Sequence, residues 1–182
     1  MHFAPDTVAD LAFLVDLGNT DPGATRSGDG LPDPAALTAL LDTHGYSGRF
    51  DRDDTELRHV RRARSWLRKS WSLPQTEMVD EINATLTAAR ALPQLVRHDG
   101  LDWHIHAISR DAPLAERITI EAAMAFSDVI RSNETDRLRV CEAEDCTGLL
   151  IDLSRNASKR FCSVRCSNRV NMIAYRSRAT SS

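Results

Sequence analysis

All four cysteines of this 182-residue chain lie near its C-terminal end, as two close pairs, Cys141-x4-Cys146 and Cys162-x3-Cys166. Each pair can span one edge of a tetrahedral metal ion, and the fifteen residues between the pairs let the second pair fold back onto the first. Four thiolates close the coordination shell of zinc and leave no position for a reacting water. The spacing therefore predicts one structural Zn2+ ion bound by all four cysteines, with two disulfides as the alternative.

The residues around the cysteines predict a small fold built on this ion. Residues 149–153 are mostly apolar, residues 154–158 are mostly polar, and residues 159–162 form a second short run, a pattern typical of a hairpin. Ser163 is placed to cap a helix whose first turn carries Cys166. Hairpin and helix holding one ion would be treble-clef-like. Because about 45 residues bury little apolar surface, we expect the metal to supply much of the folding free energy.

Several short motifs resemble a known bacterial family. These are Cys141…Cys146, Asp152-Leu153-Ser154-Arg155-Asn156, Arg160-Phe161-Cys162-Ser163 and Cys166-Ser167-Asn168-Arg169, which together resemble the CGNR zinc finger, and Leu14-Val15-Asp16-Leu17-Gly18-Asn19-Thr20, which is similar to the opening motif of the helical ABATE domain. Ser167 departs from the family pattern, which has glycine there. The resemblance implies a stress-related transcription regulator in which a zinc-dependent DNA-binding module follows a sensor-like domain.

Composition and charge support a division of the chain at residue 136. Apolar residues make up 42% and charged residues 27%, as in ordinary globular proteins. Residues 137–182 hold nine Lys and Arg against four Asp and Glu, a net charge of +5, and the totals of 23 and 26 leave 14 against 22, a net charge of −8, for residues 1–136. A basic tail on an acidic body predicts that the tail alone binds polyanions. Neither a leader peptide nor a membrane-spanning run is evident, so we expect a cytoplasmic protein without membrane contact.

Residues 1–136 predict a mainly α fold, an orthogonal helical bundle with a small β-hairpin. Helical patterns run over residues 5–17, 34–44, 54–71, 77–92 and 111–132, and the last is apolar on nearly every side, as in a central helix. Asp33-Pro34 and Asp53 with Glu56 mark helix starts. Asp16 and Asn19, near the end of the first helix, are candidates to line a ligand pocket, with local capping as the alternative.

The helix over residues 54–71 carries a run of cations that we expect to lie largely outside, either as a solvated face or as a contact to nucleic acid: Arg58, Arg61, Arg62, Arg64, Arg68 and Lys69.

A change to period two after Pro93 predicts the hairpin. An Asp99-Gly100 turn would place Val96 opposite Trp103, with Trp103 and Ile105 facing the core. His104 and His106 would then project together on the other face, either as solvated imidazoles or as part of a ligand or metal site that also uses His98.

The helix after Cys162 suggests the function. At 100° per residue, Arg165, Arg169 and Arg176 share one face, while Val170, Ile173 and Ala174 are expected to pack on the hairpin or the body. Guanidinium groups bind phosphate oxygens well. The candidate DNA-binding residues are Arg155, Lys159, Arg160, Arg165, Asn168, Arg169 and Arg176.

The leading interpretation is therefore a DNA-binding regulator whose helical domain acts as a sensor or a dimerisation unit, which leaves open a small-molecule effector and a homodimer. The alternatives are a zinc-stabilised protein-interaction module and an enzyme with a pocket around Asp16, Asn19 and the hairpin histidines. The sequence contains no nucleophile–base pair, glycine-rich phosphate loop or open metal site that would favour the enzyme.

Overall fold

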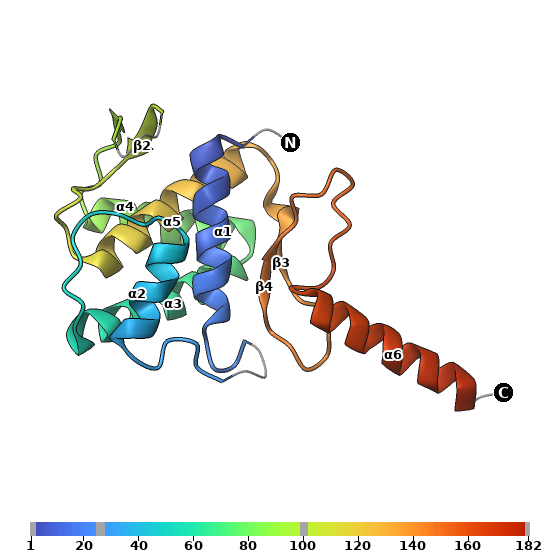
Figure 1. The fold of residues 1–182 in the computed structure, drawn as a ribbon. Coiled ribbons are helices and arrows are strands. Elements are labelled where there is room, and N and C mark those ends of the chain that lie inside the picture. Colours follow the sequence, from blue (N-terminus) through green and yellow to red (C-terminus); the bar gives the residue numbers. More distant parts are fainter. Residues whose placement is uncertain (1–2, 25–27, 99–101, 181–182) are drawn as a thin grey trace.

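The computed structural model describes residues 3–24, 28–98 and 102–180 and confirms a mainly α fold (Figure 1). The helices are α1 (Pro5–Asn19), α2 (Pro34–Thr43), α3 (Asp54–Trp71), α4 (Gln75–Ala88), α5 (Leu114–Arg131) and α6 (Val164–Thr180), with a short 3-10 turn at Thr135–Arg137. Two antiparallel hairpins complete it, β1 (Gln94–Val96) with β2 (His104–His106) and β3 (Leu138–Val140) with β4 (Leu149–Ile151). Among the helices described, none combines the length and the apolar character needed to cross a membrane.

The helix starts follow the local sequence signals. The Asp33 carboxylate accepts a hydrogen bond of 2.8 Å from the Ala36 N–H, and the Asp53 carboxylate accepts one of 2.7 Å from the Glu56 N–H. The Glu56 carboxylate does not complete the expected reciprocal capping box, because it accepts hydrogen bonds from the N–H groups of Asp51 and Arg52 instead. Both helices are therefore capped, and Glu56 also fixes the loop that enters α3.

Helix α5 is the centre of the bundle, as its apolar sequence predicts. It packs against α1, α3 and α4. Phe126 is fully buried and its ring meets that of Trp71 edge-on, with centroids 5.7 Å apart. Burial of each such side chain contributes roughly 1.5–3 kcal/mol to stability.

The cations of α3 do not form one solvated face, which corrects the sequence expectation. Arg64 is buried, and its guanidinium donates to the backbone oxygen of Thr20 at 3.1 Å and to the Asp29 carboxylate at 2.8 Å. Arg61 donates to the backbone oxygen of Leu31. Backbone carbonyls that other segments cover need hydrogen-bond donors. Arg61 and Arg64 supply these donors and so hold the segment between α1 and α2 against α3.

The hairpin of β1 and β2 differs from its expected form. Val96 lies opposite His104 rather than Trp103, so the register is shifted by one residue, and the predicted turn at 99–100 lies outside the described residues. Trp103 is 64% exposed and Ile105 47% exposed, so neither faces the core. A shift of one residue moves every side chain to the opposite face of a strand, which explains why the apolar and histidine faces are exchanged relative to the prediction.

The hairpin of β3 and β4 joins the C-terminal region to the helical body. Strand β4 pairs with β3, not with residues 159–162 as the sequence suggested. Leu149 and Ile151 belong to the same buried core as α1, α3 and α5. The backbone of Gly18 lies so close to Leu149 that a methyl group at Gly18 would meet the leucine Cδ1 at 2.6 Å. Residues on both sides of position 136 therefore share one core, and independent folding of residues 1–136 stays a prediction.

The side-chain amide of Asn19 connects α1 to β4 at this junction. Its Nδ2 donates to the Leu149 carbonyl at 2.9 Å, and its Oδ1 accepts from the Leu149 N–H at 2.7 Å. The amide thus pairs with β4 as a neighbouring strand would.

We predict that Asn19→Ala lowers the free energy of unfolding by about 1–3 kcal/mol, because a partly buried donor and acceptor of Leu149 lose their partners. Asn19→Asp keeps the acceptor for the Leu149 N–H and loses the donor to the Leu149 carbonyl. The free energy of unfolding should therefore also fall, although the Leu149 N–H stays paired. Urea denaturation of both variants beside Thr43→Ala, an exposed change at the end of α2, measures the effect. Equal stability of Asn19→Ala and wild type would contradict the role assigned to the amide.

Asp10 of α1 offers a test of burial by pH. Desolvation, with the nearby Glu121 and Asp6 carboxylates, raises the pKa of Asp10 to about 8. Between the unfolded value of about 3.9 and 8, the unfolded chain is ionised while the folded chain keeps its proton, so stability falls as pH rises, by at most about 1.4 kcal/mol per unit.

We therefore predict that Asp10→Asn gains stability relative to wild type as the pH rises from 6 to 8, because asparagine carries no proton to lose. Urea denaturation at pH 6, 7 and 8 measures the difference. The matched control is Asp42→Asn, an exposed carboxyl on α2, which should show no such trend. A constant difference between Asp10→Asn and wild type would show that Asp10 does not hold its proton in the folded state.

Candidate metal centre and nucleic-acid interface

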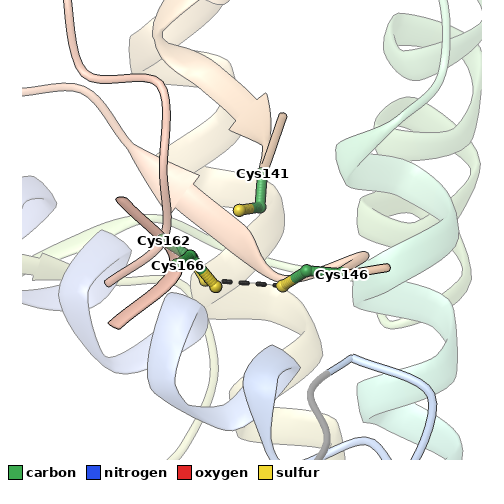
Figure 2. A group of neighbouring side chains, drawn as sticks. All are labelled: Cys141, Cys146, Cys162 and Cys166. Carbon is green, nitrogen blue, oxygen red and sulfur yellow. Dashed lines mark hydrogen bonds between the residues drawn. The ribbon is translucent and has the colours of Figure 1, made fainter. Parts of the chain in front are cut away.

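The four cysteines converge on one point, as their spacing predicts (Figure 2). Their sulfur atoms all lie within 4.8 Å of one another, and none of the four forms a disulfide. The Cys146 and Cys162 sulfurs are 3.6 Å apart, and those of Cys162 and Cys166 are 3.7 Å apart. A tetrahedral zinc ion with Zn–S bonds of 2.3 Å requires sulfur separations of about 3.8 Å, so the donor set and its spacing fit Zn2+.

Three different elements supply these ligands. Cys141 follows β3 directly, Cys146 lies in the turn before β4, and Cys162 and Cys166 flank the start of α6. The Ser163 hydroxyl accepts a hydrogen bond of 3.2 Å from the Cys166 N–H, which confirms its expected capping position. The metal centre therefore fastens α6 to the hairpin.

Groups around the cysteines orient the sulfur atoms. The Gly148 N–H donates to the Cys146 sulfur at 3.4 Å, and Arg169 Nη2 donates to the Cys166 sulfur at 3.6 Å while it pairs with the Asp145 carboxylate. A Cβ atom at Gly148 would lie 2.9 Å from the Cys162 sulfur, so only glycine fits there. Such outer contacts fix the ligands and tune the metal.

Burial favours a higher pKa for both Cys162 and Cys166, whereas hydrogen bonding raises the pKa of Cys162 and lowers that of Cys166. Desolvation raises the pKa of Cys162, and contact with the other thiols adds to this rise. For Cys166, desolvation also acts upward, but hydrogen bonds from Ser163 and neighbouring thiols outweigh it and bring the pKa to about 7. Cys166 at the helix N-terminus therefore forms a thiolate more readily than Cys162 does.

Asp152 organises the loop between the two cysteine pairs, a role that the sequence analysis did not assign. It is fully buried, and its carboxylate accepts hydrogen bonds from the Ser154 N–H at 2.9 Å and the Lys159 N–H at 2.7 Å. Burial alone would raise its pKa, but the hydrogen bonds from Ser154 and Lys159 and the charge of Arg139 hold it below the ordinary value. In the sequence, the signal for this role was its position in the motif Asp152-Leu153-Ser154-Arg155-Asn156.

The predicted DNA-binding residues separate into two groups. Arg155, Lys159, Arg160, Arg165, Asn168 and Arg176 are exposed, on the loop after β4 and on α6. Arg169 is half-buried and engaged with Asp145 and Cys166. Arg169 therefore supports the cysteine cluster rather than presenting a free guanidinium.

Helix α6 projects away from the rest of the molecule (Figure 1). Val170 is half-buried against the cysteine cluster, but Ile173 is 61% exposed and Ala174 is exposed, so the expected packing of the last two on the hairpin or the body is wrong. Beyond its first two turns the helix is exposed at each described position, residues 171–176 and 178.

Asp16 and Asn19 use their side chains within the fold. The Asp16 carboxylate lies 2.9 Å from Nε2 of His44, and Asn19 binds Leu149 as described. Neither lines the larger cavity found among the described residues, a groove of about 670 Å³ that α3, α4 and α5 form around His59, Trp66 and Glu81. The structure thus brings neither residue to that groove.

The fold and the cysteine geometry define a helical protein that carries a structural zinc finger. Comparison with family models agrees: residues 11–133 match ABATE, described as "Putative stress-induced transcription regulator", and residues 137–179 match the CGNR zinc finger. The chain therefore belongs to the ABATE family and holds one zinc ion in its CGNR finger. Neither family is described as an enzyme. No curated protein matches the chain.

We predict that Cys162→Ser loses one equivalent of zinc relative to wild type and loosens the finger, because three thiolates and a hydroxyl bind zinc far less well and the metal holds the ligand segments together. Metal analysis after purification under reducing conditions measures the loss. Ser163→Ala is the matched control, since it removes the cap of α6 but keeps every ligand. Unchanged zinc content in Cys162→Ser would refute the four-cysteine site.

Proposed function

We propose that the protein is a DNA-binding transcription regulator of the cytoplasm, whose α6 and adjoining loop contact the DNA backbone. The observation that carries the proposal is a helix that starts at the cysteine cluster and extends away from the body (Figure 1). Arg165 and Arg176 are exposed on this helix. Arg165 and Arg176 lie within about 20° of each other around the helix axis. The family description as a transcription regulator supports the same function.

The charge distribution favours the same surface. The region after residue 136 carries a net charge of +5 while the preceding region carries −8. On the acidic body, Arg61, Arg64 and Arg68 are committed to backbone oxygens and carboxylates. The finger therefore offers the cations that a polyanion would meet, and each phosphate contact releases counterions from DNA.

The loop after β4 extends this surface. The buried Asp152 carboxylate fixes the loop at the Lys159 N–H, so that exposed Arg155 and Lys159 are carried by the same finger as α6. Arg160 is exposed as well, and its guanidinium pairs with the Glu142 carboxylate at 2.6 Å. We assign Arg155 and Lys159 to phosphate contacts, and Asn168 to an adjacent contact from the first turns of α6.

We predict that the double change Arg165→Ala, Arg176→Ala weakens binding to duplex DNA while leaving zinc bound, because neither residue contacts a cysteine sulfur. Each lost phosphate contact should lower the slope of log K against log salt by about 0.9. Titration of labelled duplex at several salt concentrations, with metal analysis, measures both effects.

The matched control is Arg58→Ala, Arg62→Ala, which removes two exposed cations from α3 and should leave DNA binding unchanged. Arg169→Ala should differ from both, since it removes the Asp145 pair and a hydrogen bond to Cys166 and so weakens the zinc site as well. DNA affinity that is equal in wild type and in the Arg165, Arg176 variant would refute the proposed surface.

A second candidate, a protein-interaction or dimerisation module, rests on the apolar side chains of α6. The side chains of Val164, Met172 and Tyr175 are 76%, 53% and 66% exposed. Clustered exposed apolar side chains of this kind mark surfaces that contact another protein. Sedimentation of wild type and Met172→Ala, Tyr175→Ala tests this function. If wild type forms a dimer that the double change dissociates, and wild type does not bind DNA, the interaction module is favoured over the regulator.

For either function, we propose the groove of α3, α4 and α5 as the place where an effector binds.

A further inference from the structure

Three histidines of the β1–β2 hairpin bring their imidazole nitrogens to one point. His98 Nε2 lies 2.9 Å from His106 Nε2, and His104 Nε2 lies 3.2 Å from each of them. All three side chains are half-buried. The shifted register produces this arrangement, because it places His104 and His106 on the face to which His98 also turns.

Hydrogen bonds alone cannot satisfy this triangle. Each Nε2 atom is either an N–H donor or a lone-pair acceptor, and with three atoms and two roles at least one pair must share a role. Two donors or two acceptors at 2.9–3.2 Å repel each other. A cation at the centre of the group removes the conflict, because all three nitrogens can then present lone pairs.

The outer nitrogens of two rings show which role their inner nitrogens take. His104 Nδ1 lies 2.7 Å from the Asp102 carbonyl oxygen, which can only accept, so Nδ1 carries the proton. His106 Nδ1 lies 3.5 Å from the Glu121 carboxylate, which favours a proton on Nδ1 in the same way. Both neutral rings therefore present bare Nε2 atoms to each other. This pairing of a metal-facing Nε2 with an Nδ1–H held by a carbonyl or a carboxylate is the usual arrangement of a histidine ligand.

Glu121 in turn is fixed from the body of the protein. The Tyr46 hydroxyl donates a short hydrogen bond to its second oxygen, and Tyr46 is held by the Arg117 guanidinium 5.3 Å from its ring centre. Helix α5 thus supports the orientation of His106. The site is built on a hairpin but positioned by the core.

We propose that His98, His104 and His106 form a second metal site, which binds a divalent first-row transition metal such as Zn2+ through three Nε2 atoms. With bonds of about 2.1 Å, an ion equidistant from the three nitrogens would lie roughly 1 Å out of their plane. Three neutral imidazoles cap one side of the ion and leave at least one coordination position for water or an anionic ligand. The donor set suits Zn, Ni, Cu or Fe rather than Mg or Ca.

This site differs in kind from the cysteine cluster. Four thiolates fill the shell of the finger zinc, whereas three imidazoles leave the second ion open to exchange of its remaining ligands. It also lies on a different part of the molecule, since the hairpin and α6 are at opposite ends in Figure 1. The proposal is independent of DNA binding, and either can fail alone.

The test is a Zn2+ titration of the full-length, untagged protein whose finger is already loaded with zinc. Calorimetry measures the binding, and we expect wild type to bind one further equivalent of Zn2+. His104→Gln, His106→Gln should weaken that step by roughly 100-fold or more, since two of three ligands are lost. Glu77→Gln, which changes an exposed carboxylate on α4, is the matched control and should bind as wild type does.

Two further measurements separate a metal site from a structural role. Glu121→Gln keeps the size of the side chain but removes its charge, and should weaken Zn2+ binding by about 10–100-fold as a positioning residue. In nitrogen NMR of the histidines, Zn2+ should shift the Nε2 and not the Nδ1 resonances of the three hairpin rings.

The exposure of Trp103 and Ile105 shows that the hairpin adds little to the core, so the glutamine variants should keep the helical circular dichroism of wild type. Absence of a further equivalent in wild type would overturn the proposal. So would binding that the histidine double variant retains, or Nε2 resonances that Zn2+ leaves unchanged.

Discussion

The packing of β4 against α1 is the contact on which the rest of the structure depends. Leu149 enters the core of the helical bundle, and its backbone is bound on both sides by the amide of Asn19. Arg68 reinforces the junction by donating to the Gly18 carbonyl at 2.9 Å and to the Thr147 carbonyl at 3.0 Å. The zinc finger consequently shares a buried core with the helical body. Its hairpin is fixed in the body, and α6 extends away from it (Figure 1).

This junction determines how charge is used. The bundle uses several of its arginines within its own fold, as Arg64 shows by its burial among Thr20, Asp21 and Asp29. A charge that is paired in this way cannot also neutralise a phosphate without leaving its partners unsatisfied. On the finger, Arg169 has such a role, whereas Arg165 of α6 is exposed. The same residue type thus has a structural role in α3 and a proposed recognition role in α6.

The two clusters of metal-ligating side chains illustrate a second division. The cysteines lie on short segments that bring four sulfurs around one point, so that metal binding and folding of the finger are coupled. The histidines lie on a hairpin that projects from a stable bundle, and their arrangement depends on Glu121 of α5. We infer that loss of the first metal would affect the fold of the finger, whereas loss of the second would leave the bundle intact.

The sequence by itself determined the features that depend on neighbours along the chain. The spacing of Cys141, Cys146, Cys162 and Cys166 specified the zinc ligands, and Asp33 before Pro34 specified a helix start, because a cap and a pair of ligands form within a few residues. The resemblance of the short motifs also identified the family. The apolar sequence of α5 placed it correctly at the centre, since a helix that is apolar on nearly every side has to be surrounded.

Tertiary structure alone decided what depends on distant segments. The partner of β4, the burial of Arg64 and the pairing of Asn19 with Leu149 depend on segments that are not neighbours along the chain, and no local pattern encodes which partner a polar side chain will find. The histidine triangle is the clearest case. The sequence left open whether these histidines are solvated imidazoles or part of a ligand or metal site. A shift of one residue in the register of β1 and β2 exchanges the two faces of the hairpin and brings three imidazole nitrogens to one point.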